Sequence, residues 1–510
     1  MENRRVRVRF APSPTGALHI GGVRTALYNY LFAKKQGGDF ILRIEDTDQG
    51  RFVEGAEQYI INALRWCGIT PNEGIGFGDG PCAPYKQSER KPMYRQYADR
   101  LIQSGHAYYA FDTSEELEQM RKKIEAAGGS ASYNAITRQT MKNSLTLSED
   151  EVKKKLDARE HYVIRIKIPR NEEVRVKDII RGWVVVQSSQ LDDKVLFKSD
   201  GMPTYHLANV VDDYLMKITH VIRGEEWLPS APLHVLLYRY LGWEEAMPQF
   251  AHLPLLLKPD GNGKLSKRDG DRLGFPVFPL EWTDPSSKEI SSGYRERGYF
   301  PDAFVNMLAL LGWHTSGNRE LFSLEELAQE FSLDRVSKAG AKFDPEKSKW
   351  FNQQYLRMKS DQELAKAFIP VLEQKGIEIN AGYVEQVCRL IKEKAYFINE
   401  FWELGSYFFT EPAGYDQDVI KKRWNENSAK FISELKELFN TIGEFTAAET
   451  EKAFKEVAEK SGINPGQVMQ LFRVCISGTG GGPALFEMVE LLGKEKVVRR
   501  MEMALNKIGK

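Results

Sequence analysis

The first candidate for chemistry is the stretch Pro12–Gly22, which contains Ser13, His19 and a glycine pair at Gly21 and Gly22. It follows a segment that alternates as a strand does, and it precedes apolar residues at helical spacing. A helix N-terminus at the carboxyl end of a parallel strand offers N–H groups to a phosphate. His19 can donate a hydrogen bond to such a ligand. Taken alone, the stretch is also compatible with an ordinary strand–helix turn and a capping histidine.

A second candidate is the basic run Lys264–Arg268, which reads KLSKR and lies in the polar segment 259–272. Two lysines and an arginine around Ser266 suit a phosphate group. A Walker A loop is excluded, because Leu265 occupies the position that needs Ser or Thr after the glycine and lysine. Taken alone, a basic run of this kind is also typical of a solvated surface loop.

The surrounding pattern predicts a sheet that positions both loops. Residues 6–10 alternate as a strand, residues 26–31 recur at helical spacing, and residues 40–44 form a second apolar strand. This is a strand–helix–strand unit, the start of a doubly wound α/β domain. Short apolar segments at 195–197, 218–222 and 250–253, with a helix near 232–240, predict the second half of the same sheet.

The rest of the chain divides by pattern. Residues 88–193 mix helical and strand patterns and predict an inserted α+β domain that splits the sheet into halves at 1–87 and 194–258. From about residue 301 the pattern becomes helical, with candidate capping boxes at Ser323, Ser360 and Thr446. We therefore expect a further domain at 259–340 and an all-α region at 341–510, in two subdomains.

Composition limits the function classes. The chain has 510 residues, which predicts several domains, and 71 basic side chains balance 71 acidic ones. Net charge therefore gives no sign of a nucleic-acid partner. Four dispersed cysteines favour buried thiols over a metal or redox role. No apolar run approaches the length of a membrane span, and the basic start lacks the apolar core of a signal peptide, so a cytoplasmic location is expected.

Together, and in this order around a split sheet, the two loops resemble the HIGH and KMSKS motifs of class I aminoacyl-tRNA synthetases. Four further blocks resemble those of bacterial glutamyl-tRNA synthetases: Arg9–Gly16, Arg43–Asp48, Pro203–Asp213 and Arg223–Trp227. Phe343–Asn352 resembles that family's junction with its anticodon-binding part. The likeness runs nearly from end to end.

The departures from the family pattern are small. The first motif reads His-Ile-Gly-Gly and the second Lys-Leu-Ser-Lys-Arg, as is common in glutamate-specific members. Some bacterial members bind zinc through cysteines in the inserted domain, where this chain has Tyr109, Phe111 and Tyr133; the resemblance therefore implies no zinc and no other resident metal. The stretch Gly274–Gly298 is longer than the family pattern and has no assigned role.

The resemblance implies roles residue by residue. Those expected in catalysis are His19, Lys264, Ser266 and Lys267. Those expected to bind ATP are Ser13, Gly21, Gly22, Glu226, Trp227 and Lys267. Those expected to bind glutamate are Arg9, Ala11, Ser13, Glu45, Tyr205, Asn209 and Arg223, with the two guanidinium groups on carboxylates.

The implied activity joins L-glutamate to tRNA(Glu) through a glutamyl-adenylate, with transfer to the 2′-hydroxyl of the terminal adenosine. ATP is a substrate, and Mg²⁺ is held mainly by its phosphates. By resemblance, residues 88–193 bind the acceptor end, 259–340 contact the stem, and 341–510 read the anticodon. A monomer is expected, and the residues equally allow charging of tRNA(Gln).

Two rival functions and two close relatives share parts of this pattern. A nucleotidylyltransferase shares a similar histidine–glycine motif, but it lacks the second basic loop and the long helical end. A non-catalytic tRNA-binding descendant is disfavoured because the chemical residues of both loops are present. The short paralogue that glutamylates queuosine has no anticodon-binding region, and glutaminyl-tRNA synthetase has β-barrels where this chain reads as helices.

Overall fold

The computed structural model describes residues 4–129 and 132–508, and the chain divides into two compact units. The first unit comprises residues up to 297 together with 304–345, and the second comprises 298–303 together with the residues from 346 onward. Residues 1–3, part of the basic start that favoured a cytoplasmic location, lie outside the described range.

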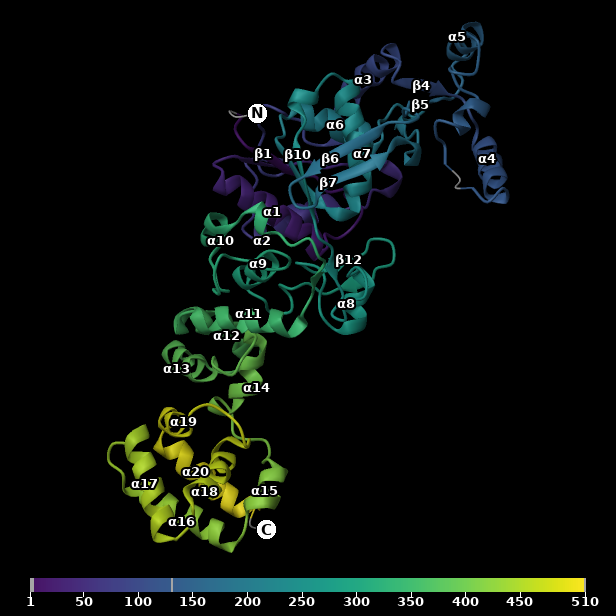
Figure 1. Ribbon diagram of the computed structural model, residues 1–510. Coiled ribbons are helices and arrows are strands. Elements are labelled where there is room, and N and C mark those ends of the chain that lie inside the picture. Colours follow the sequence, from purple (N-terminus) through teal and green to yellow (C-terminus); the bar gives the residue numbers. More distant parts are fainter. Residues whose placement is uncertain (1–3, 130–131, 509–510) are drawn as a thin grey trace. The chain divides into compact units, whose positions relative to one another are not determined.

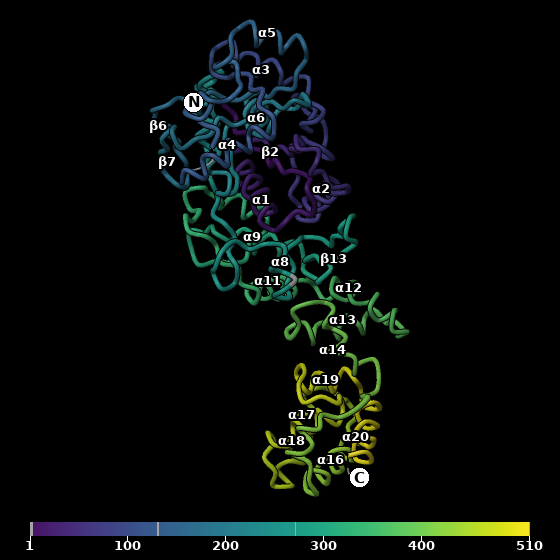
Figure 2. Tube along the Cα trace, turned by 90° about the vertical axis from the view of Figure 1, so that its right-hand side faces the viewer, coloured from purple at the N-terminus to yellow at the C-terminus, as the bar shows by residue number. Residues whose placement is uncertain are grey.

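The first unit begins with the expected strand–helix–strand pattern. Strand β1 (Arg7–Phe10) pairs in parallel with β2 (Asp39–Leu42), and β2 pairs in parallel with β3 (Glu73–Gly74). Helix α1 (Ile20–Lys35) connects β1 to β2, and α2 (Ala56–Trp66) connects β2 to β3. These elements lie together at the purple end of the colour scale in Figures 1 and 2. The parallel arrangement confirms the predicted α/β class.

The second half of the sheet adjoins β1. Strands β9 (His220–Gly224) and β10 (Gln249–Leu253) are parallel, and the N–H group of Thr219 donates to the carbonyl of Arg7, 2.9 Å away. Beyond β10 come β6 (Glu173–Asp178) and β7 (Gly182–Gln187), in the order β7-β6-β10-β9. Helices α6 (Tyr205–Leu215) and α7 (Ala231–Tyr240) accompany this half.

Two expectations about the halves of the sheet were wrong. The strand Val195–Phe197 (β8) was expected in the second half, but it pairs antiparallel with β5 (Val163–Ile166), which also pairs with β4 (Ala107–Ala110). Conversely, β6 and β7 fall within residues 88–193, the expected insertion, yet β6 pairs with β10 of the catalytic sheet. A short apolar segment predicts that a strand is present, but it does not predict which strand it pairs with.

The remaining elements of this part of the chain lie in the inserted region or follow β10. Those of the inserted region are α3 (Lys91–Gln103), α4 (Ser114–Ala126) and α5 (Glu149–Asp157). Those that follow β10 are β11 (Leu256–Leu257), α8 (Lys267–Leu273), β12 (Trp282–Thr283), β13 (Ile290–Ser291), α9 (Pro301–Ala309), α10 (Leu324–Glu330) and β14 (Ala341–Lys342). Strands β11 and β14 pair in parallel, so residues on both sides of 259–340 meet.

The second unit is helical, as predicted, and no strand occurs in its described residues up to 508. Its helices are α11 (Pro345–Met358), α12 (Asp361–Gln374), α13 (Ala381–Ile391), α14 (Phe401–Gly405), α15 (Gln417–Arg423), α16 (Glu426–Thr441), α17 (Ala447–Lys460), α18 (Pro465–Ser477), α19 (Leu485–Leu492) and α20 (Lys494–Ile508). Ser360 and Glu363 form the expected reciprocal cap of α12. In neither unit does a described helix combine the length and apolar character needed to cross a bilayer.

The core of the second unit allows a stability test. Leu435 on α16 is fully buried among apolar side chains. Leu435→Ala should lower the free energy of unfolding by about 2–5 kcal/mol, because the lost methyl groups leave a cavity. Urea unfolding followed by circular dichroism measures this change. Lys430→Ala, on the exposed side of the same helix, is the matched control, and an equal loss in both variants would contradict the assigned core.

Candidate active site

The two candidate loops meet in the first unit. The turn after β1 contains Gly16, whose φ of +123° is one that side chains rarely adopt. A Cβ atom placed there would lie 3.3 Å from the Nζ atom of Lys267, at the start of α8. The loop of the first motif and the loop of the second therefore approach each other, although more than 240 residues separate them.

One cavity of about 340 Å³ collects most of the predicted binding residues. It lies at the carboxyl ends of β1 and β9, where a parallel sheet opens its crevice. Every residue expected to bind glutamate lines it, as does every residue expected to bind ATP except Lys267: Arg9, Ala11, Ser13, Gly21, Gly22, Glu45, Tyr205, Asn209, Arg223, Glu226 and Trp227.

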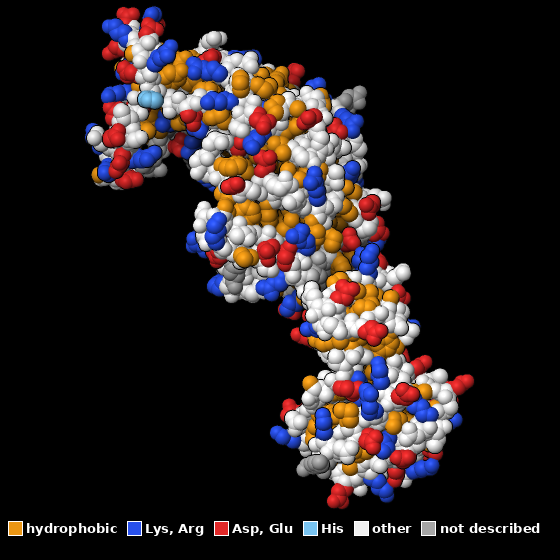
Figure 3. All heavy atoms as spheres, turned by 180° about the vertical axis from the view of Figure 1, so that it is seen from behind, with side chains coloured by type: hydrophobic (Ala, Val, Ile, Leu, Met, Phe, Trp, Pro, Cys, Tyr) orange, Lys and Arg blue, Asp and Glu red, His pale blue; other side chains and the backbone are white. Residues whose placement is uncertain are grey.

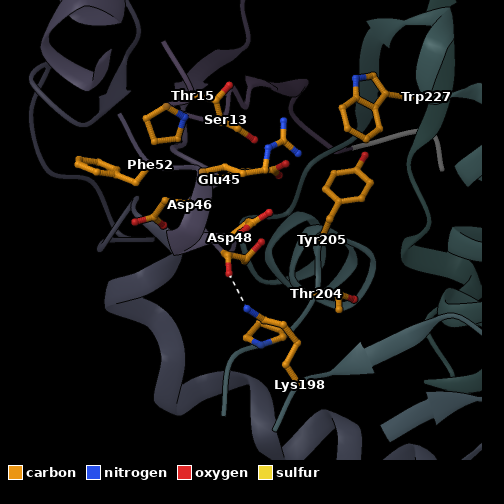
Figure 4. A pocket seen from close by; sticks show the side chains of 14 residues that line it. Ser13, Thr15, Glu45, Asp46, Asp48, Phe52, Lys198, Thr204, Tyr205 and Trp227 are labelled. Atoms are coloured by element: carbon orange, nitrogen blue, oxygen red, sulfur yellow. Dashed lines mark hydrogen bonds between the residues drawn. The ribbon is translucent and has the colours of Figure 1, made fainter. Parts of the chain in front are cut away.

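A neighbouring cavity of about 430 Å³ shares several of these walls (Figure 4). In Figure 4, Tyr205 and Trp227 lie on one side of the cavity and face the segment that carries Glu45 on the other side. This second cavity is also lined by residues to which the sequence gave no role: Asp46, Asp48, Phe52, Lys198 and Thr204. The first two lie in the block Arg43–Asp48, so that block was the available signal.

Two of the buried arginines are neutralised within the protein. The Nε and Nη2 atoms of Arg9 donate to the two carboxylate oxygens of Asp213 at 3.0 and 3.1 Å. Arg43 donates to Asp213 at 2.8 Å and to Glu45 at 2.7 Å, and Asn209 donates to Glu45 at 2.8 Å. Burial raises the pKa of Asp213, but the two guanidinium groups outweigh it and hold that pKa below its usual value. Two cations thus balance two anions.

Arg223 has no such counter-charge. Its side chain is buried, with 5% of the residue exposed, and its three hydrogen bonds go to the ring of His252, the hydroxyl of Tyr205 and the carbonyl of Trp227. Among the residues that the structure describes, no carboxylate forms an ion pair with it. Burial without a counter-ion lowers its pKa. A buried cation of this kind favours an anionic ligand.

His19 has the capping role that the sequence allowed, and its second ring nitrogen has no partner in the described residues. It is the N-cap of α1, where its Nδ1 atom accepts the N–H of Gly21 at 3.1 Å. The proton must then be on Nε2, which is buried and has no hydrogen-bond partner in the described part of the chain. Burial and the charges of Lys264 and Lys267 lower the pKa of His19 to about 4. The ring therefore presents a neutral N–H donor.

The second loop is held by local bonds. The ammonium of Lys264 forms an ion pair with Glu226 at 2.9 Å, and the hydroxyl of Ser266 is used in the N-cap of α8, where it meets Asp269. The ammonium of Lys267 lies over the ring of Phe278, 5.4 Å from its centroid. Lys264 and Lys267 are therefore the donors of this loop that can turn toward a ligand, whereas Ser266 shapes the loop.

The stretch Gly274–Gly298, which the sequence left without a role, contacts both loops. The ring of Phe278 also packs edge-on against His19, with centroids 6.4 Å apart, and the carbonyl of Val277 accepts the N–H of Ile20 at 3.0 Å. Further along, Trp282 of the β12–β13 hairpin packs edge-on against Tyr59 of α2. The stretch thus lies beside the N-terminus of α1 and beside the loop that contains Lys267.

The structure offers no dedicated metal cage within residues 4–129 and 132–508, since no group of three or more His, Cys, Asp and Glu side chains gathers there. Aromatic residues stand in the region where some bacterial members have zinc-binding cysteines: Tyr109 packs edge-on against Tyr162, and Tyr133 donates to Asp112. The absence of zinc stays a prediction.

Fold and site together define a nucleotide-binding α/β enzyme with an attached helical region, and the comparisons give its class. The profile of the catalytic domain of class I tRNA synthetases (E and Q) matches residues 5–350, and the profile of an anticodon binding domain matches residues 363–505.

Curated relatives extend over the whole chain. The glutamate–tRNA ligase of Cytophaga hutchinsonii is 57% identical over 99% of this chain and 98% of its own length, and that of Parabacteroides distasonis is 57% identical over 99% of both. A crystal structure of a glutamate tRNA ligase from Elizabethkingia meningosepticum, in complex with its amino acid, is 49% identical, with a TM-score of 0.95 over 99% of this chain and 100% of the other. The chain belongs to the glutamate–tRNA ligase family.

The state of His19 generates a pH prediction. Its pKa in the folded protein is about 4, against an ordinary 6.5, so the unfolded chain binds more protons between these values. The contribution of His19 to stability is therefore complete above pH 6.5 and is lost as the pH falls toward 4. An NMR titration of the imidazole should give a midpoint near 4, and a midpoint near 6.5 would contradict the buried, neutral donor.

Proposed function

We propose that this chain attaches L-glutamate to the 3′-terminal adenosine of tRNA(Glu) at the expense of ATP. The reaction passes through a glutamyl-adenylate and ends on the 2′-hydroxyl of that adenosine. The observation that carries the proposal is the cavity in which an uncompensated guanidinium, Arg223, lies beside the two loops that approach each other at Gly16 and Lys267. Family membership supports the same reaction.

Glutamate binding is assigned to the inner part of that cavity. Arg223 holds a substrate carboxylate, because its charge has no partner in the protein and a guanidinium binds carboxylates bidentately. Tyr205, Asn209 and Ser13 line the same space and supply polar contacts, as do Arg9 and the backbone at Ala11. We assign the substrate ammonium to Glu45, a carboxylate that lines the same cavity and is held in place by Arg43 and Asn209.

Activation needs positioning and charge neutralisation. The substrate carboxylate is already ionised, so one of its oxygens attacks the α-phosphorus and the bond to pyrophosphate breaks without a protein base. We assign the neutral Nε2–H of His19 and the ammonium groups of Lys264 and Lys267 to the phosphate oxygens. Glu226 and Trp227 line the side where adenosine would bind, with Gly21 and Gly22 beside them. Mg²⁺, when bound with ATP, neutralises phosphate charge.

Transfer to tRNA involves the other parts of the chain. We assign residues 88–193, apart from β6 and β7 of the catalytic sheet, to the acceptor end, 259–340 to the stem and 341–510 to the anticodon, the last because an anticodon-binding profile matches 363–505. The face shown in Figure 3 mixes acidic and basic side chains, so phosphate contacts there would depend on local groups of cations. We further propose that the protein acts as a monomer in the cytoplasm.

Arg223→Ala tests the glutamate site. Glutamate-dependent ATP–pyrophosphate exchange, measured with tRNA present, should fall by about 100-fold or more, because the carboxylate loses its charged partner. ATP affinity should change little. Arg239→Ala, which removes a half-exposed arginine of the same unit, is the control. Exchange near the wild-type level in the Arg223 variant would remove this residue from the site.

Lys267→Ala tests the phosphate assignment. The single-turnover rate of adenylate formation should fall by about 10²–10³-fold, since a cation facing the transition state is lost, while the glutamate KM stays within a few-fold. Arg272→Ala, on the exposed side of α8, controls for changes in the helix itself. An unaltered rate in the Lys267 variant would contradict the assignment.

A further inference from the structure

The Nε atom of Arg223 has a partner that the reaction scheme does not use. Arg223 and His252 are direct neighbours in the register of the parallel strands β9 and β10. The Nε–H of Arg223 donates to Nε2 of His252 at 3.0 Å. A guanidinium only donates, so Nε2 of the histidine must carry its lone pair at this contact.

The other ring nitrogen of His252 is held from the next strand. Its Nδ1 atom lies 2.6 Å from Oδ2 of Asp178, the last residue of β6, and the same carboxylate accepts the backbone N–H of His252 at 3.1 Å. The second oxygen of Asp178 accepts the N–H groups of Ile180 and Arg181 at 2.9 and 2.8 Å. Both side chains, His252 and Asp178, are fully buried. A carboxylate in this position accepts the Nδ1–H, which fixes the tautomer that Arg223 requires.

The histidine stays uncharged in this chain of hydrogen bonds. Burial lowers the pKa of His252 and outweighs the opposing influence of the Asp178 carboxylate, while the neighbouring Arg223 lowers it further. The contact with Arg223 therefore holds the guanidinium without adding or removing charge. This differs from Arg9, whose guanidinium contacts the carboxylate of Asp213 directly.

A count of donors shows what remains for a ligand. A guanidinium has five N–H groups. Nε donates to His252, one Nη1–H to the Tyr205 hydroxyl at 2.7 Å, and one Nη2–H to the Trp227 carbonyl at 3.2 Å. One N–H remains on each terminal nitrogen. The cation therefore keeps one donor on each terminal nitrogen for the oxygens of a carboxylate.

We propose that Asp178 and His252 are positioning residues that fix the plane of the Arg223 guanidinium and preserve its full charge, so that the cavity selects a carboxylate over a carboxamide. The inference rests on the proposed function and extends it to the basis of selection between glutamate and glutamine. Neither residue lines the cavity, and both act through Arg223. A carboxylate in the place of His252 would also hold the arginine, but it would neutralise the positive charge that attracts the substrate carboxylate.

Three variants of the full-length protein separate this role from simple packing. His252→Leu removes the acceptor. His252→Gln restores it, because an amide can accept from Arg223 through its oxygen and donate to Asp178 through its nitrogen. Asp178→Asn places an amide donor opposite Nδ1 and favours the other tautomer, whose Nε2–H would face the donor of Arg223. The control is His220→Gln, which changes a half-buried histidine at the far end of β9 that contacts Thr219.

The readouts are the KM values for glutamate and for ATP in pyrophosphate exchange with tRNA, the preference for glutamate over glutamine, and the ¹⁵N shifts of the His252 ring. We expect His252→Leu and Asp178→Asn to raise the glutamate KM by about ten- to a hundredfold and to weaken the preference, because a hydrogen bond to a charged group is lost. The ATP KM should stay within a few-fold, and His252→Gln should stay near the wild type. In the wild type, the shifts should report a protonated Nδ1, and in Asp178→Asn a protonated Nε2.

An unchanged glutamate KM in a folded His252→Leu or Asp178→Asn protein would overturn the inference, as would a His252→Gln protein no better than His252→Leu. If His252→Leu does not fold, Asp178→Asn and His252→Gln still decide. Wild-type and His220→Gln proteins that activate no glutamate would instead contradict the proposed function.

Discussion

The active site depends on the cost of burying a guanidinium without a counter-ion. Three arginines, Arg9, Arg43 and Arg223, are almost completely buried at one end of the sheet. Two of them are neutralised by Asp213 and Glu45, and the third contacts only neutral groups. An unpaired buried charge costs several kcal/mol, and a ligand carboxylate recovers part of that cost. On the proposed function, this imbalance gives the cavity a preference for an acid, before any detail of shape is considered.

The fold maintains this imbalance of charge. The register of β9 and β10 fixes the separation of Arg223 and His252, and Arg9 lies on β1, which adjoins β9 through the bond between Thr219 and Arg7. Asp213 comes from α6, and Asp178 from the end of β6. The ion pairs that neutralise Arg9 and Arg43 also tie α6 to the sheet, which keeps Tyr205 and Asn209 of the same helix beside Arg223. Substrate selection and local stability therefore depend on the same contacts.

Much of this arrangement could be predicted from the sequence, because its signals are local. The alternation of residues 6–10, the helical spacing after His19 and the cap at Ser360 each predicted an element that the structure contains. The cavity residues came from a family resemblance, and the structure brings them together. What could not be predicted was partner choice over long range. One example is the catalytic sheet, which contains β6 and β7 but not β8. Another is the ion pair between Arg9 and Asp213. The contact of His252 with Arg223 could not be predicted for the same reason, because one polar residue in an apolar strand gives no information about its partner.

In the proposed function, the uncompensated charge on Arg223 selects the ligand. Equilibrium binding of L-glutamate and L-glutamine to the wild-type protein, in the presence of tRNA, tests it most directly. The two ligands have nearly the same shape and differ in charge at one group. Glutamine should bind at least about 100-fold more weakly, because a neutral amide leaves the buried cation without a counter-ion. Equal affinities for the two amino acids would contradict it.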